Sequence, residues 1–160
     1  MKSASERVKT MRLTALLLFL GTSTVLAAGP ASQVASGDDA AKLQGSWSIV
    51  SVEIDGQALA MDNLKGASLN IQGTRYSFQL QKTRLELSFK LDASKSPKTI
   101  DLEVVEGPEK GKVYHGIYKL EKDRYTICRT TEPGKERPTK FATQAKSGLM
   151  IVVWDKVVVP

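Results

Sequence analysis

Three successive stretches in the middle of the chain alternate strictly between apolar and polar residues. They span residues 76–81, 85–92 and 99–104, and short turn segments separate them. In an extended strand, a period of two places all the apolar side chains on one face, whereas a helix would distribute them around its axis. The pattern therefore predicts antiparallel strands with one face buried and the other in contact with water.

Residues 112–131 carry the clearest hairpin signal. Two runs rich in β-branched and aromatic residues flank the polar turn Glu121–Arg124. A turn with an even number of residues places Gly116 opposite Arg129, which leaves a gap in the predicted wall beside a long cationic side chain. Strand alternation puts His115 and Cys128 on one face of the hairpin and Tyr118, Tyr125 and Arg129 on the other.

Further strand-like runs flank this central region. The first continues from Gln44 to Ile54, and the last, Leu149–Trp154, is apolar on both faces, as a strand covered on both sides would be. A short strand is predicted at residues 139–143, and residues 57–66 are expected to form a loop or short helix across one barrel mouth. About eight strands at a spacing of roughly 8–12 residues, with no long helix, predict an all-β fold, a small antiparallel up-and-down β-barrel.

The first 28 residues have the layout of a secretory signal peptide. A basic segment ends at Arg12, an apolar core follows at residues 13–20, and Ala27 and Ala28 offer the small residues needed for cleavage. The apolar run is short, which favours cleavage over an uncleaved membrane anchor. We expect an exported protein, periplasmic or secreted, with no membrane span after cleavage. Residues 1–28 would be the signal peptide, 29–42 a flexible linker and 43–160 the barrel domain.

Much of the positive charge belongs to this leader. The whole chain has a formal net charge of +6, and removing residues 1–27 takes away four basic residues and one acidic residue, which leaves +3. That charge is ordinary for a domain of this size, and we predict no nucleic-acid partner. Cys128 is the only cysteine, so no intrachain disulfide can form.

Several short segments resemble a known family. Gly45-Ser46-Trp47 is similar to the G-x-W of lipocalin-like barrels, in which the tryptophan plugs the closed end. From Leu43 onward, the ordered segments L-Q-G-S-W, S-P-K-T-I-D-L, G-P-E-K-G-K, G-I-Y-K-L, Y-T-I-C and G-K-E-R-P-T-K-F resemble a lipocalin-like (calycin-type) domain of unknown function abundant in planctomycete-type bacteria. The resemblance implies that Gly45 and Trp47 close the barrel. Because that family has no assigned activity, the resemblance implies no activity for this chain. Unlike true lipocalins, the sequence has no T-D-Y-x-x-Y segment and no long C-terminal helix.

Candidate catalytic and metal-binding residues are few. A zinc site needs three or four nitrogen, sulfur or carboxylate ligands, and this chain has one histidine, His115, and one cysteine, Cys128. Cys128 lies mid-strand among β-branched residues, and no third group orients His115, so nucleophilic catalysis is not indicated. Asp101 and Glu103 are expected on the solvated side of their strand. We predict no enzyme activity, no metal and no cofactor.

The inward-facing aromatic residues are the best functional candidate. With Arg129 as the one charged group, they would line a cavity suited to an amphiphile with an acid head, since an arginine fork pairs well with a carboxylate. The predicted ligand-binding residues are Tyr76, Phe78, Phe89, Tyr118, Tyr125 and Arg129. In the alternative, the rings fill the barrel and Arg129 stacks over Trp47 as a closing plug.

The sequence is compatible with two functions. The first is an exported, non-enzymatic domain that binds a small apolar or amphipathic ligand inside the barrel. The alternative is a protein-interaction or scaffold module of the cell envelope with a filled barrel. It would contact a protein partner through the loop Glu132–Pro138 and its basic rim, which includes Lys135 and Arg137. The free volume inside the barrel distinguishes the two.

Overall fold

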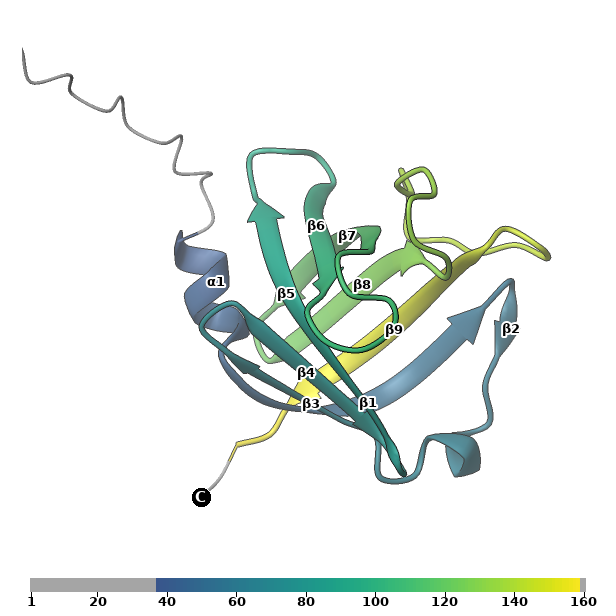
Figure 1. The fold of residues 1–160 in the computed structure, drawn as a ribbon, viewed down its shortest axis with the longest axis horizontal. Coiled ribbons are helices and arrows are strands. Elements are labelled where there is room, and N and C mark those ends of the chain that lie inside the picture. Colours follow the sequence, from purple (N-terminus) through teal and green to yellow (C-terminus); the bar gives the residue numbers. More distant parts are fainter. Residues whose placement is uncertain (1–36, 159–160) are drawn as a thin grey trace, which may run out of the picture. The chain divides into compact units, whose positions relative to one another are not determined.

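The alternating stretches form strands of a closed antiparallel barrel (Figure 1). The structure is a computed structural model that describes residues 37–158, so the predicted signal peptide and the first part of the predicted linker lie outside the described residues. In chain order the elements are α1 (Gly37–Leu43), β1 (Gly45–Ile54), β2 (Gln57–Ala58), the 3-10 helix η1 (Met61–Leu64), β3 (Ser68–Gln72), β4 (Arg75–Leu80), β5 (Thr83–Asp92), β6 (Lys98–Val104), β7 (Val113–Glu121), β8 (Arg124–Thr130) and β9 (Leu149–Lys156).

Each barrel strand pairs with the next one in sequence, and β1 closes the barrel by pairing with β9. The register of the closing pair shifts between Ile49 and Ser51, as it does at a β-bulge. The short strand β2 is an extra element, which pairs only with the end of β1. The predicted all-β up-and-down barrel of about eight strands is therefore confirmed.

The hairpin of β7 and β8 has the predicted register. Its two-residue turn is Lys122-Asp123, and Gly116 lies opposite Arg129. A side chain at Gly116 would not fit, because an added Cβ would lie 2.9 Å from the Cys128 carbonyl oxygen and 3.0 Å from the Arg129 Cβ. The missing side chain thus lets the Arg129 stem lie against the backbone of β7.

Apolar side chains from all eight barrel strands meet in one core, as the period-two pattern predicted. The last strand follows the prediction as well. Met150, Val152 and Trp154 belong to the core or pack against it, and the outward-facing Ile151 and Val153 are half-buried. Leu43 of α1 and Leu64 of η1 add to the same core from outside the barrel strands.

The helix α1 packs against the barrel end at which β1 begins. The Trp47 indole Nε1 donates a hydrogen bond to the Leu43 carbonyl oxygen at 2.8 Å, and its ring packs edge-on against Tyr125. The Asp39 carboxylate accepts hydrogen bonds from the Tyr118 hydroxyl at 2.8 Å and the Lys98 Nζ at 2.7 Å. The stretch predicted as a linker therefore ends, within its described part, in a helix that belongs to the barrel unit.

The predicted strand at residues 139–143 is wrong. Residues 131–148 form an irregular loop, because β8 and β9 pair directly with each other from Thr130 and Leu149 onward and leave no free edge between them. The loop instead covers the outer face of the barrel. Ile117 and Cys128 face outward from their strands, yet they are only 1% and 0% exposed.

Candidate ligand-binding site

The barrel contains a cavity of about 210 Å³, so its interior is not completely filled. Aliphatic and aromatic side chains of β1, β4, β5, β6 and β9 line it, and Arg129 is the one charged residue in the lining. Leu59 and Leu64, from the connection between β2 and β3, complete the wall. Leu59 is 37% exposed, which places this connection at the boundary between the cavity and solvent.

Three of the six predicted ligand-binding residues line this cavity, namely Tyr76, Phe78 and Arg129. Phe89 and Tyr125 belong to the packed core, and Tyr118 bonds to Asp39. The two residues predicted to close the barrel lie at its α1 end, where Trp47 is 1% exposed and Gly45 has a φ of +110°, which disfavours side-chain-bearing residues.

Sequence reasoning did not single out the other lining residues, among them Trp154, Leu59 and Leu64. Trp154 could have been found, because it has the same parity as Val152 in the last strand and so faces the same side. Leu59 and Leu64 follow no strand period. Their contribution depends on how the connection after β2 folds over the mouth, which the sequence pattern does not encode.

Arg129 has no acidic partner within residues 37–158. Its Nη1 donates a hydrogen bond to the Thr130 carbonyl oxygen at 2.7 Å, and its guanidinium lies 5.0 Å from the centre of the Tyr114 ring. Desolvation lowers the pKa of the guanidinium, but the residue remains the single positive charge of an apolar cavity. The expected stacking of Arg129 on Trp47 is wrong, because Lys156 covers that ring instead, at 5.4 Å.

Other polar groups of the barrel interior lack partners. The Tyr125 hydroxyl and the Trp154 Nε1 are buried and have no hydrogen-bond partner in the described part of the chain. Burial raises the pKa of Tyr76 to about 12 and that of Tyr125 well above its ordinary value, so both phenols are protonated at neutral pH. The interior is therefore rich in unused donors and poor in negative charge.

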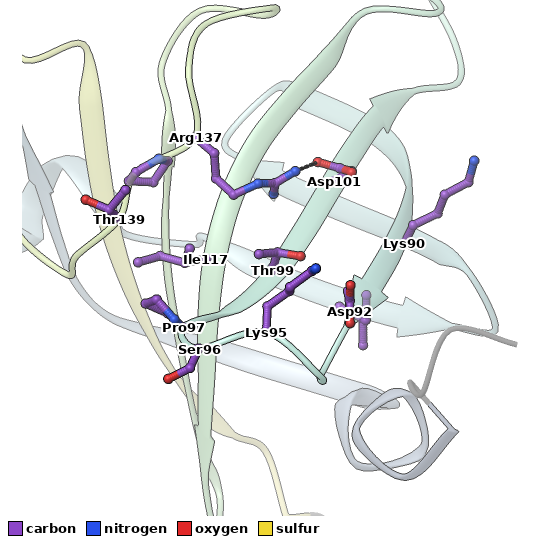
Figure 2. Close-up of a pocket in the computed structure, with 12 residues that line it drawn as sticks. Lys90, Asp92, Lys95, Ser96, Pro97, Thr99, Asp101, Ile117, Arg137 and Thr139 are labelled. Carbon is purple, nitrogen blue, oxygen red and sulfur yellow. Dashed lines mark hydrogen bonds and ion pairs between the residues drawn. The ribbon is translucent and has the colours of Figure 1, made fainter. Parts of the chain in front are cut away.

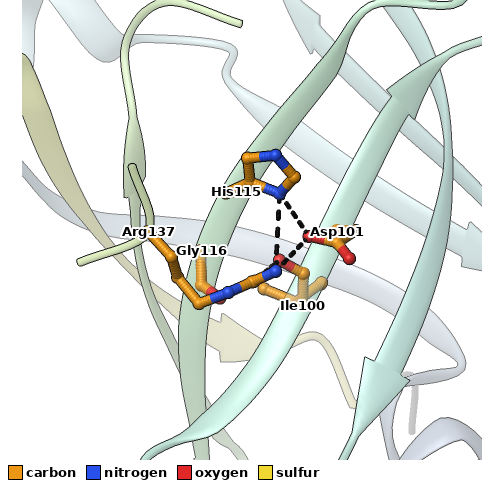
Figure 3. Close-up of polar contacts among 5 residues, drawn as sticks. All are labelled: Ile100, Asp101, His115, Gly116 and Arg137. Atoms are coloured by element: carbon orange, nitrogen blue, oxygen red, sulfur yellow. Dashed lines mark hydrogen bonds and ion pairs between the residues drawn. The ribbon is translucent and has the colours of Figure 1, made fainter. Parts of the chain in front are cut away.

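A second polar cluster lies on the outer face of the barrel (Figure 3). Arg137, from the loop 131–148, donates through Nη1 to the carbonyl oxygens of Ile100 and Gly116 at 2.9 and 2.7 Å. Its Nη2 donates to the Asp101 carboxylate at 2.6 Å, and His115 Nδ1 lies 2.7 Å from the same oxygen. Arg137 therefore fixes the loop to β6 and β7.

Asp101 lies on the outer side of its strand, as expected, with a side chain that is 38% exposed, but its carboxylate is also bound by Arg137 and His115. Burial acts to raise its pKa, but the hydrogen bonds and charges of His115 and Arg137 outweigh this effect and hold the pKa below its ordinary value. Arg137 is likewise committed to the barrel wall, and Lys135 pairs with Glu132 at 3.3 Å. The basic rim expected on this loop is therefore much reduced.

A groove of about 670 Å³ adjoins this cluster between the loop and the outer faces of β5 and β6. Figure 2 shows Arg137 and Thr139 on one side of it, Lys90 and Asp92 on the other, and Lys95 between them. Lys90 and Lys95 form no ion pair with any residue from 37 to 158. The groove therefore presents two ammonium groups that form no ion pair, beside hydroxyl groups and the carboxylates of Asp92 and Asp101.

Replacing Arg137 with alanine should expose Cys128. The change removes charge-assisted hydrogen bonds worth about 2 kcal/mol, and a local opening that is easier by this amount raises the labelling rate of a covered thiol on the order of 30-fold. The measurement is the rate at which a thiol reagent labels Cys128 under native conditions. Lys135→Ala, an exposed change in the same loop, is the control and should leave the rate unchanged. Equal rates for both variants would show that Arg137 does not hold the loop.

The described residues show neither a metal site nor a membrane-spanning helix. Within residues 37–158, no three His, Cys, Asp or Glu side chains are grouped so as to hold a metal ion. No helix in the same range combines the length and the apolar character needed to cross a bilayer.

Comparison with protein-family models, curated proteins and solved structures finds no match to this chain. Its fold and interior define it as a closed antiparallel β-barrel with a small apolar cavity. The resemblance of its sequence segments to lipocalin-like domains stays a prediction.

Proposed function

We propose that this protein is an exported, non-enzymatic barrel that binds a small apolar or amphipathic ligand in its interior. The observation that carries the proposal is the cavity of about 210 Å³ with its nearly continuous apolar lining. Ligand pockets are typically concave and apolar with a few placed polar groups, and this cavity has that composition. A cavity of about 150 Å³ can hold a benzene molecule, so this one is suited to ligands of roughly eight non-hydrogen atoms.

Filling the cavity should abolish binding. Val52 and Val152 face each other across the closing pair of strands and both line the cavity, so replacing both with phenylalanine puts two rings into the free volume. We expect native protein to bind the neutral probes ethylbenzene and 1-heptanol in calorimetric titrations, and the double variant to lose this binding.

The matched control is Ile151→Phe, which adds a ring on the outer face of the same strand and should leave binding unchanged. Thermal unfolding of each variant verifies that it is folded. The proposal would be contradicted if the native protein bound neither of the two neutral probes. It would also be contradicted if the native and cavity-filled proteins bound them equally.

The outer groove supports a second candidate function, a protein-interaction module of the cell envelope. Its volume of about 670 Å³ and the uncommitted Lys90 and Lys95 suit an acidic segment of a partner protein. Changing both lysines to alanine should abolish pull-down of an envelope partner without altering thermal stability. The matched control replaces the exposed Lys82 and Lys110, which lie outside the groove lining. Equal pull-down by the two double variants would count against this function.

A further inference from the structure

The chemistry of the cavity narrows the class of ligand. An arginine has five N–H donors and no acceptor, and the structure gives Arg129 one hydrogen-bond acceptor, the Thr130 carbonyl oxygen. The Trp154 indole can only donate, and it is buried without a partner among residues 37–158. A ligand that supplies acceptor atoms and negative charge would use the Arg129 donors that the protein itself leaves without an acceptor.

The surroundings of Arg129 favour an anion over a neutral acceptor. No carboxylate forms an ion pair with Arg129 in the described part of the chain, and the guanidinium lies over the uncharged Tyr114 ring, 5.0 Å from its centre. A partly buried cation without a counter-ion is costly in an apolar environment, and an incoming carboxylate removes that cost. The guanidinium fork also matches a carboxylate in a two-point contact, which a hydroxyl group cannot reproduce.

The rest of the lining sets the shape of the ligand. Away from Arg129 and Tyr76, it consists of aliphatic and aromatic side chains such as Leu64, Phe78 and Leu102. These offer no partner to a second charged or strongly polar group. The free volume of about 210 Å³ accommodates roughly eight non-hydrogen atoms by comparison with a cavity that holds benzene.

Building on the ligand-binding function proposed above, we propose that the barrel binds monocarboxylic acids with a short hydrocarbon part, with the carboxylate paired to Arg129. The Tyr76 side chain lines the same cavity. The hydrocarbon part packs against the aliphatic wall toward Leu64. Affinity should rise with chain length until the cavity is filled and then level off.

The test compares two probes of equal size in calorimetric titrations of the full chain. Hexanoate and 1-heptanol each have eight non-hydrogen atoms, by their formulae. Since 1-heptanol has seven alkyl carbons and hexanoate has five, apolar burial favours 1-heptanol, and a preference for hexanoate has to come from its acid group. We expect native protein to bind hexanoate at least about tenfold more tightly than 1-heptanol. In Arg129→Met, this preference should disappear, while the affinity for 1-heptanol stays the same.

Each outcome bears on a different claim. Equal affinity of native protein for the two probes would overturn the acid preference and leave the proposed ligand-binding function intact. If native protein bound neither probe, both the acid preference and the proposed ligand-binding function would be overturned. Arg129→Lys is the second variant, since it keeps the charge but loses the fork, and it should bind hexanoate with an affinity between those of native protein and Arg129→Met. An unchanged hexanoate affinity in Arg129→Met would assign the acid recognition to another residue and refute the inference.

Discussion

Replacing Trp47 with alanine should lower the free energy of unfolding by about 4 kcal/mol, the largest effect that we expect from a single substitution in this protein. The side chain is 1% exposed and packs edge-on against Tyr125 at a ring separation of 5.8 Å. Its indole Nε1 also holds the end of α1 through the Leu43 carbonyl oxygen. The substitution therefore leaves a large cavity and an unpaired carbonyl group together. Urea denaturation of the full chain, followed by circular dichroism, measures the change.

Trp47→Phe separates the two contributions. The phenyl ring retains much of the packing but cannot donate to Leu43, so we expect a loss of about 1–2 kcal/mol, well below that of the alanine variant. A loss under about 1 kcal/mol for Trp47→Ala would show that the end of the barrel rearranges to fill the space. In that case Trp47 would not close the barrel.

The second large effect is expected at Asp39, where replacement by alanine should cost about 2 kcal/mol. The carboxylate is 6% exposed and joins α1 to two strands, since it accepts hydrogen bonds from Tyr118 and Lys98. Removing one member of a buried pair typically costs about 3–5 kcal/mol because it leaves the partner unsatisfied. The lower figure applies here because Lys98 has a side chain that is 41% exposed, so water can solvate its charge.

The adjacent residue provides a matched control. Asp38 lies on the same helix and pairs with Lys42, but its side chain is 82% exposed. Asp38→Ala should therefore change the free energy of unfolding by less than about 0.5 kcal/mol. A double-mutant cycle between Asp39 and Tyr118, with Tyr118→Phe, isolates their hydrogen bond. Equal effects of Asp38→Ala and Asp39→Ala would show that Asp39 does not fix α1 to the barrel.

The same carboxylate predicts how stability depends on pH. Burial acts to raise the pKa of Asp39, but the hydrogen bonds from Lys98 and Tyr118 and the nearby positive charges outweigh it, so the pKa in the folded state lies below its ordinary value of 3.8. The stabilisation is fully present above the unfolded-state pKa and is lost as pH falls through the folded-state pKa. Native protein should therefore lose stability more steeply below pH 3.8 than Asp39→Ala does, in denaturation curves measured across that range.

Local sequence was sufficient to predict most of the fold. The alternation at residues 85–92 and 99–104 follows from the two-residue repeat of an extended chain, which holds whatever the strand packs against. The pairing of Gly116 with Arg129 follows from the two-residue turn at Lys122, because turn length sets the register of a hairpin. The strand predicted at residues 139–143 failed because pairing needs a free strand edge, and β8 and β9 leave none.

The candidate site was only partly predictable. Parity identified Tyr76, Phe78 and Arg129 as inward-facing, but it could not tell which inward residues border a cavity and which are packed in the core. That distinction depends on how side chains from eight strands fill a shared volume, which is a property of the closed barrel and of no single strand. The roles of Arg137 and Asp101 were missed for the same reason, since they meet only when a distant loop folds back over the wall.

The sequence by itself determined that this chain forms antiparallel strands, which faces of them are apolar, and that one arginine faces inward among aromatic residues. These properties are set by neighbours along the chain. Only the tertiary structure decided that the barrel closes between β1 and β9, that about 210 Å³ inside it stays free, and that Arg129 has no acidic partner within residues 37–158. Those properties depend on contacts between residues far apart in sequence, and they turn an inward-facing arginine into a candidate acid-binding site.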